Sequence, residues 1–201
     1  MRQSFFLIVI FASLSVVYSQ HNDPIVTNEG DSIIAPPKPV MNAVKIDVFS
    51  WFGGVGVLKY ERVFSENLSA QLGFFYAFSF PIYDSDVYYA TGFAITPEFR
   101  YYLSNKNPAP RGIYLAPNYR YQKLDAENLE ENSEATVITN SIAFNLGYQL
   151  VLKDIFLVEA WVGPAYNIRN VEDETVPGAS IGPETEDGFG IRMGVSIGLV
   201  F

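Results

Sequence analysis

The last part of the chain, Gly188–Phe201, alternates strictly between apolar side chains and small or polar ones. Phe189, Ile191 and Met193 begin a series in which every odd-numbered residue is apolar, whereas the even-numbered positions are mainly glycine and include Arg192. A period of two residues predicts a β-strand. Soluble strands usually have roughly 5–6 residues, whereas a tilted strand of about 9–11 residues crosses a bilayer. We therefore interpret this segment as the closing strand of a transmembrane β-barrel.

The same alternation recurs upstream, in segments separated by turn-forming or polar residues. In the segment 68–80, for example, Leu72 and Phe74 alternate with Gln71 and Gly73. The predicted strands cover residues 42–51, 55–64, 68–80, 90–103, 112–123, 136–151, 155–168 and 188–201. The sequence therefore predicts an all-β fold, an eight-stranded antiparallel up-and-down barrel of the outer-membrane type.

Alternation alone does not decide which face of a barrel points inwards. A soluble lipocalin-like barrel would turn its apolar face inwards, around an apolar ligand. The apolar faces here are aromatic and nearly unbroken along whole strands, and the opposite faces are rich in Gly, Ala, Ser and Asn. Aromatic residues also gather towards the strand ends, as the interface girdles of membrane barrels do. We therefore expect the apolar faces to meet lipid, and keep the secreted soluble barrel as an alternative.

The N-terminus has the features of a secretory signal peptide. Arg2 precedes an apolar run over residues 5–17, and Ser19 stands where a small residue precedes a cleavage site. The predicted organisation is a signal peptide over 1–19, a flexible Pro-rich periplasmic leader over 20–41 and a barrel over 42–201. This organisation predicts that the mature protein resides in the cell outer membrane.

Composition excludes several other classes of protein and site. The chain has no Cys, which excludes disulfides, thiolate metal sites and a lipid-anchoring cysteine. A net charge of −9 argues against nucleic-acid binding. The one histidine, His21, falls in the predicted leader, away from a barrel rim where a catalytic base would be needed. We therefore predict no catalytic residue, no cofactor and no metal site.

The predicted connections alternate between long and short. If both termini are periplasmic, the outward connections contain Asp84, Asp86, the stretch Asp125–Glu134 and the stretch Glu172–Asp187, which together hold more than half of the 22 acidic residues. Long outer loops and short periplasmic turns are typical of membrane barrels. Only the short first connection does not fit this pattern.

Three prolines, Pro97, Pro117 and Pro164, fall in the middle of predicted strands. Proline has no N–H to donate to a neighbouring strand. We therefore expect a bulge or local splaying of the sheet at each of them.

The inward faces would collect nine charged side chains, five positive and four negative. They are Lys45, Asp47, Lys59, Glu61, Glu98, Arg100, Arg120, Glu159 and Arg192. Isolated ions in a narrow lumen would be costly, so they must pair or hold water. Eight strands enclose a space that side chains can fill. We therefore predict a plugged lumen with an internal ion network, the alternative being a path for protons or small solutes.

Five segments carry a family resemblance. They are Asn42–Asp47, Tyr60–Val63, Thr96–Leu103, Pro110–Pro117 and Leu146–Gln149. In order and spacing they resemble a family of small outer-membrane β-barrel proteins of Bacteroidetes-type bacteria, classed as a domain of unknown function. The resemblance, which extends to the proline-containing strands, implies an eight-stranded outer-membrane barrel without an established activity or cofactor. It also implies that Phe201 is an aromatic C-terminal signal for the barrel-assembly machinery.

These observations predict a non-catalytic outer-membrane barrel with an envelope-structural or surface-interaction role. Its expected partners are outer-membrane lipid, lipopolysaccharide and the barrel-assembly machinery, whereas the sequence does not identify an extracellular partner for the acidic loops. A narrow transport barrel for protons or small solutes is the main alternative.

Overall fold

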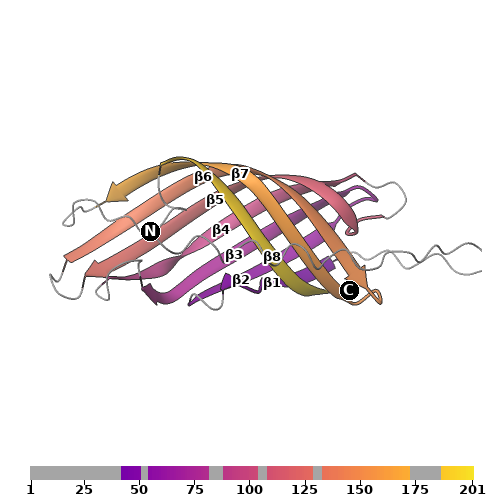
Figure 1. Ribbon diagram of the computed structural model, residues 1–201, viewed down its shortest axis with the longest axis horizontal. Coiled ribbons are helices and arrows are strands. Elements are labelled where there is room, and N and C mark those ends of the chain that lie inside the picture. Colours follow the sequence, from indigo (N-terminus) through magenta and orange to yellow (C-terminus); the bar gives the residue numbers. More distant parts are fainter. Residues whose placement is uncertain (1–41, 51–53, 82–87, 104–107, 129–132, 173–186) are drawn as a thin grey trace, which may run out of the picture. The chain divides into compact units, whose positions relative to one another are not determined.

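A computed structural model of the chain describes residues 42–50, 54–81, 88–103, 108–128, 133–172 and 187–201. These residues form a closed antiparallel barrel in which each strand pairs with the next in sequence and the last pairs back with the first (Figure 1). The predicted signal peptide, the predicted leader and His21 lie outside the described residues. Among the residues that are described, no helix is long and apolar enough to cross a membrane.

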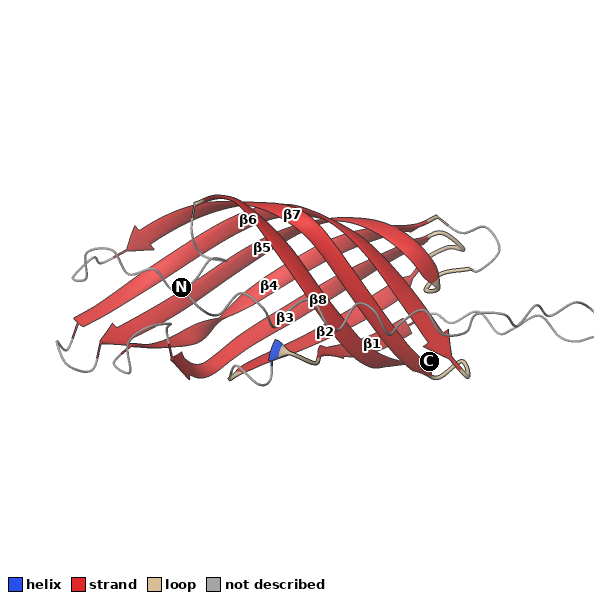
Figure 2. Cartoon of the chain, in the orientation of Figure 1, coloured by secondary structure: helices blue, strands red, loops and turns tan. Residues whose placement is uncertain are grey.

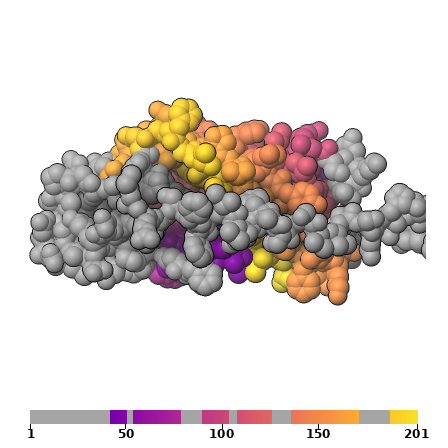
Figure 3. Space-filling model, in the orientation of Figure 1, coloured from indigo at the N-terminus to yellow at the C-terminus, as the bar shows by residue number. Residues whose placement is uncertain are grey.

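The barrel wall is built entirely of strands (Figure 2). In chain order they are β1 (Asn42–Asp47), β2 (Val55–Val63), β3 (Leu68–Pro81), β4 (Tyr88–Tyr102), β5 (Gly112–Asn128), β6 (Ser133–Leu152), β7 (Phe156–Glu172) and β8 (Gly188–Val200). The prediction of eight antiparallel strands in an up-and-down order is therefore confirmed. In the space-filling view, β7 in orange and β8 in yellow lie side by side along the surface, as their pairing requires (Figure 3).

The first strand is shorter than predicted. β1 ends at Asp47 rather than at residue 51, because the chain turns over residues 48–50, where the Ser50 hydroxyl donates a hydrogen bond to the Asp47 carbonyl oxygen at 3.1 Å. In a strand over 42–51, alternation predicts that Phe49 shares the inner face with Lys45 and Asp47. The turn instead leaves the Phe49 side chain 59% exposed.

Three strands are longer than predicted. β5, β6 and β7 contain 17, 20 and 17 residues. The interpretation of Asp125–Glu134 as a loop is therefore wrong for most of that stretch, which continues the β5–β6 ladder. At the base of this continuation the Thr136 hydroxyl donates a hydrogen bond to the Asp125 carboxylate at 2.7 Å across the ladder. In the sequence, residues 125–134 contain only two apolar residues, Ala126 and Leu129, so apolar alternation gave no sign of this continuation.

The mid-strand prolines interrupt hydrogen-bond ladders without changing the register. Pro97 and Pro117 both lie beside gaps in the ladder between β4 and β5, whose remaining pairs, such as Ile95 with Tyr121, share one register. Pro164 lies beside a similar gap between β6 and β7. Local loss of pairing therefore accommodates the missing N–H groups, as the sequence predicted.

Apolar side chains cover the outside of the barrel and charged ones fill the inside. Phe74, Phe144 and Ile197 on the outer face are 46%, 47% and 44% exposed. Lys45 and Glu61 on the inner face are completely buried. The core of this barrel is therefore largely polar, and its apolar surface points away from the axis.

Candidate functional site

The structure places all nine predicted interior charges inside the barrel. Buried among them are Lys45, Lys59, Glu61, Glu98, Arg100, Glu159 and Arg192. The other two, Asp47 and Arg120, are half-buried and line an internal cavity. Adjacent strands supply these side chains in register, so that residues distant in sequence become neighbours across the lumen.

Lys45 on β1 is the first of two cations at the centre of the network. Its Nζ lies 2.6 Å from Glu159 Oε2, 2.8 Å from Glu61 Oε2 and 3.0 Å from Gln149 Oε1. An ammonium group has three protons to donate. All three therefore find acceptors, two of them ionised, and this satisfies a cation that has no access to water.

Arg100 on β4 reaches the same acceptors from another strand. Its Nη1 lies 2.8 Å from Glu159 Oε2 and 2.9 Å from Gln149 Oε1, and its Nε lies 2.6 Å from Glu98 Oε1. The guanidinium also lies 4.3 Å from the ring centre of Tyr114. Since Nη1 also lies 3.3 Å from Glu61 Oε2, Arg100 joins the carboxylates of three strands, and the planar fork of arginine suits this role better than a point charge would.

An aromatic layer lies directly beside these ions. The Tyr102 hydroxyl donates to Glu61 Oε1 at 2.6 Å, and the Tyr102 and Tyr114 rings are 5.5 Å apart. Both tyrosines belong to an apolar cluster that includes Val63 and Ala109. The layer therefore combines hydrogen bonds to the network with packing against the β4–β5 turn.

A second ion pair joins the strands at which the barrel closes. Lys59 Nζ on β2 lies 2.7 Å from Asp47 Oδ1 on β1 and 3.0 Å from the hydroxyl oxygen of Ser196 on β8. Ser196 also donates a hydrogen bond to Asp47. Lys59 Nζ lies 5.1 Å from the ring centre of Trp161. Three side chains thus connect β8, β1 and β2.

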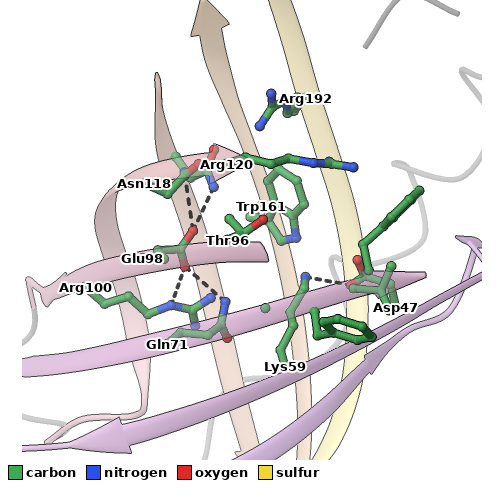
Figure 4. A pocket seen from close by; sticks show the side chains of 15 residues that line it. Asp47, Lys59, Gln71, Thr96, Glu98, Arg100, Asn118, Arg120, Trp161 and Arg192 are labelled. Carbon is green, nitrogen blue, oxygen red and sulfur yellow. Dashed lines mark hydrogen bonds and ion pairs between the residues drawn. The ribbon is translucent and has the colours of Figure 1, made fainter. Parts of the chain in front are cut away.

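A cavity of about 80 Å³ lies inside the barrel next to both groups of ions (Figure 4). Glu98 lies at its wall and accepts hydrogen bonds from Gln71 Nε2 at 3.2 Å and from Asn145 Nδ2 at 3.0 Å. Arg120 and Arg192 also line it. A cavity needs a volume of roughly 10–15 Å³ to hold one buried water. This cavity therefore has room for several waters or for a small polar group.

The alternation pattern identifies the interior charges but not the neutral groups that join them. Gln149, Tyr102 and Tyr114 are almost completely buried in the network. Each occupies an inward position of its strand, as Tyr102 does two residues after Arg100. Position parity therefore predicts that they face inwards, although not that they are partners of these ions.

Phe201 follows β8 and closes the barrel through its backbone. Its N–H donates to the Asn42 carbonyl, and the Asn42 N–H donates to the Phe201 carbonyl, each at 3.0 Å. Its side chain is 67% exposed. The phenyl ring is thus available to a partner.

Within the described parts of the chain, no group of three or more His, Cys, Asp or Glu side chains is arranged to hold a metal ion. Comparison with curated proteins and with solved structures gave no match. Residues 7–198 match a family described as "Protein of unknown function (DUF3575)". The match covers nearly the whole sequence, and the chain therefore belongs to the DUF3575 family.

Proposed function

We propose that this protein is a non-catalytic integral outer-membrane β-barrel with a plugged, ion-paired lumen and acidic extracellular loops, and that it supports the envelope or presents those loops to a partner. The observation that carries the proposal is the inverted distribution of polarity. Ile142 is 68% exposed on the outer face, whereas the ionised side chains of Lys45, Glu61 and Glu159 are completely buried.

The outer surface supports a lipid environment. Exposed large apolar side chains occur on all eight strands, among them Leu58 on β2, Ile95 on β4 and Val162 on β7. Soluble monomers rarely expose a continuous apolar patch larger than a few hundred Å². A band of this kind around a whole barrel is stable in hydrocarbon and would drive aggregation in water.

Aromatic side chains at the strand ends support the same environment. Phe64, Phe156 and Phe201, 61%, 55% and 67% exposed, follow or begin strands at the end that carries the C-terminus. Phe78 and Phe189 lie near the opposite ends of β3 and β8, 59% and 88% exposed. Two such girdles mark the membrane interfaces of outer-membrane barrels.

The interior contacts support a plugged lumen. Lys45 and Arg100 share the carboxylates of Glu61 and Glu159, and the Tyr102 ring packs beside them. Breaking one partner of such a buried cluster leaves an uncompensated charge, which is strongly unfavourable. A lumen filled in this way favours a structural or surface-interaction role over passage of a solute.

Cell fractionation combined with surface proteolysis tests the proposal. The full chain should appear in the outer-membrane fraction, and protease added to intact cells should cut within residues 173–186. Boiled and unboiled samples should migrate differently in detergent gels, because an intact barrel resists unfolding by detergent. Recovery in the aqueous periplasmic fraction, with no heat-dependent shift, would instead favour a secreted soluble barrel with an apolar ligand.

A narrow transport barrel is a second candidate, favoured by the charged cavity beside Glu98 and Arg192. Planar-bilayer recordings of the purified protein test this function directly. Conductance or proton flux above background, lost on substitution of a cavity residue, would support transport. A silent bilayer containing demonstrably inserted protein would eliminate it.

A further inference from the structure

A groove of about 630 Å³ lies on the outer face of the barrel, across β2, β3, β4 and β5. Sites for small molecules usually have volumes of roughly 300–1,000 Å³. Short or flat side chains, those of Ala70, Pro97 and Pro117, line the groove. Larger side chains stand next to them, since the strand register pairs Ala70 with Phe99 and Pro97 with Leu72. Small residues among large ones therefore leave a hollow in the outer surface.

Both prolines of the groove lie where the β4–β5 ladder is interrupted. The register of that ladder places Pro97 opposite Tyr119 and Pro117 opposite Phe99, and neither pair belongs to the ladder. Each proline costs its strand a ladder hydrogen bond. Their flat rings, however, leave the groove open between the larger side chains.

The exposed lining of the groove is apolar and aromatic. Tyr60, Leu72, Phe99 and Tyr119 are 45%, 54%, 52% and 44% exposed. The two tyrosine hydroxyls already donate to asparagine side chains, at 2.7 Å and 2.5 Å. The rings, rather than the hydroxyls, are therefore left to contact an occupant, and such a surface fits a hydrocarbon chain.

One end of the groove carries a charge. Two charged residues line the groove, and one of them, Glu98, is buried and faces the lumen, where it accepts a hydrogen bond from Arg100. The other, Arg62, is exposed on the outer face, and its Nη1 donates to Asn42 Oδ1, a neutral acceptor, at 2.7 Å. Among the described residues, no carboxylate forms an ion pair with Arg62. The groove therefore presents one uncompensated positive charge.

This charge lies towards the end of the barrel that carries the C-terminus. Arg62 stands two residues before the exposed ring of Phe64, and Tyr60, which pairs with Leu72, lies two residues further from that end. Aromatic girdles mark the interfaces of a membrane barrel, and interfacial cations attract anionic lipid head groups. In the proposed membrane location, the guanidinium thus lies near the level of the lipid phosphates, and the apolar part of the groove extends into the hydrocarbon.

We propose that the groove is a binding site for an anionic phospholipid, whose phosphate lies on Arg62 and whose acyl chain lies over Pro97 and Pro117. The charge selects the head group, and the apolar lining holds the chain. The inference rests on the proposed membrane location, because the lipid reaches the groove from the bilayer.

A fluorescent label beside the groove tests the inference. The chain has no Cys, so I95C introduces a single thiol for a bimane label. Ile95 is exposed on β4, two residues from Pro97, and does not line the groove. The labelled protein is inserted into phosphatidylcholine vesicles, and insertion is verified by the heat-dependent gel shift. Phosphatidylglycerol or phosphatidylcholine carrying a nitroxide at carbon 5 of one acyl chain is then added.

We expect saturable quenching of the label at residue 95 by phosphatidylglycerol, at lower concentrations than by phosphatidylcholine. I197C, labelled in the same way, is the control, because Ile197 is exposed on β8 and does not line the groove. The two lipids should quench the label at residue 197 equally.

Substitutions separate the charge of the groove from its shape. R62Q should lower the preference for phosphatidylglycerol about fivefold, the effect of one interfacial cation, and R62K should retain most of it. N42A removes the acceptor of Arg62 but leaves its charge, so it should bind as the parent does. A70F keeps the charge and fills the hollow, and it should abolish the saturable component. The heat-dependent gel shift verifies that each variant is folded.

Equal quenching by the two lipids at residue 95 in inserted protein would overturn the inference and leave the membrane proposal standing. Selective quenching that survives A70F would show that the lipid lies outside the groove, and would also overturn it. Loss of quenching by both lipids as the protein density in the vesicles rises would show that a second copy of the chain, rather than a lipid, covers the groove. Failure of insertion would instead contradict the proposed function.

Discussion

Glu61 connects side chains from several strands of the interior network. Its Oε1 accepts hydrogen bonds from Tyr102 at 2.6 Å and Ser69 at 2.5 Å, and its Oε2 accepts from Lys45 at 2.8 Å and Gln149 at 3.2 Å. One carboxylate thus connects side chains from five strands, its own included. Glu61 therefore stabilises the barrel by accepting hydrogen bonds from groups that would otherwise be buried without partners.

E61A should therefore destabilise the barrel by about 3–5 kcal/mol, the range for breaking a buried ion pair. Equilibrium urea unfolding of the protein refolded in phospholipid vesicles measures the loss. E66A, which removes an exposed carboxylate from the β2–β3 turn, is the control and should stay within about 0.5 kcal/mol of the parent. Equal stabilities of E61A and E66A would contradict the network described above.

The contact between Lys45 and Glu159 can be measured separately. K45M and E159Q should each destabilise the protein, because each removes one charge from a completely buried ion network. The double variant should be less destabilised than the sum of the two by about 1 kcal/mol or more, as expected for residues in direct contact. A double-mutant cycle in the same unfolding assay measures this coupling, and strict additivity would show that the 2.6 Å contact contributes nothing specific.

At the scale of the strand, alternation predicted the number, order and facing of the elements well. The predicted strand bounds were wrong at several strand ends, where the sequence no longer alternates between apolar and polar residues. β1 stops at Asp47 because of a local turn, and β5 to β7 continue into polar sequence. The interior charges followed from parity alone, whereas their pairing depends on the stagger between strands, which one sequence does not reveal.

Close approach between strands makes some inward glycines irreplaceable. A Cβ at Gly163 on β7 would lie 2.2 Å from the Phe144 carbonyl oxygen and 2.8 Å from the Asn145 Cα of β6. Backbone atoms cannot move aside as a flexible side chain can. G163A should therefore cost about 1–3 kcal/mol, as overpacking does. G190A faces open space and should change stability by less than about 0.5 kcal/mol in the same unfolding assay, and equal losses would show that the two positions are equally crowded.

At the scale of the whole molecule, the role of Phe201 that we propose, as a signal for barrel assembly, can be tested separately from folding. Its ring is 67% exposed, while its backbone bonds to Asn42 would survive a change of side chain. F201A should therefore refold in vesicles with a stability within about 0.5 kcal/mol of the parent, but accumulate poorly in the outer membrane of cells. Quantitative immunoblots of fractionated cells measure the difference, with L199A, an exposed apolar residue two positions earlier, as the control. Normal accumulation of F201A would show that the C-terminal aromatic is not read as a signal.

Pro97 and Pro117 both lie beside the β4–β5 ladder, and this placement affects which strands separate first when the barrel unfolds. The β5–β6 pairing runs unbroken from Gly112 to Asn128, whereas the β4–β5 ladder has gaps beside both prolines. Amide protons flanking those gaps should exchange with deuterium sooner than those of the β5–β6 seam. Under heat or tension, the β4–β5 strands would then separate before the β5–β6 strands do.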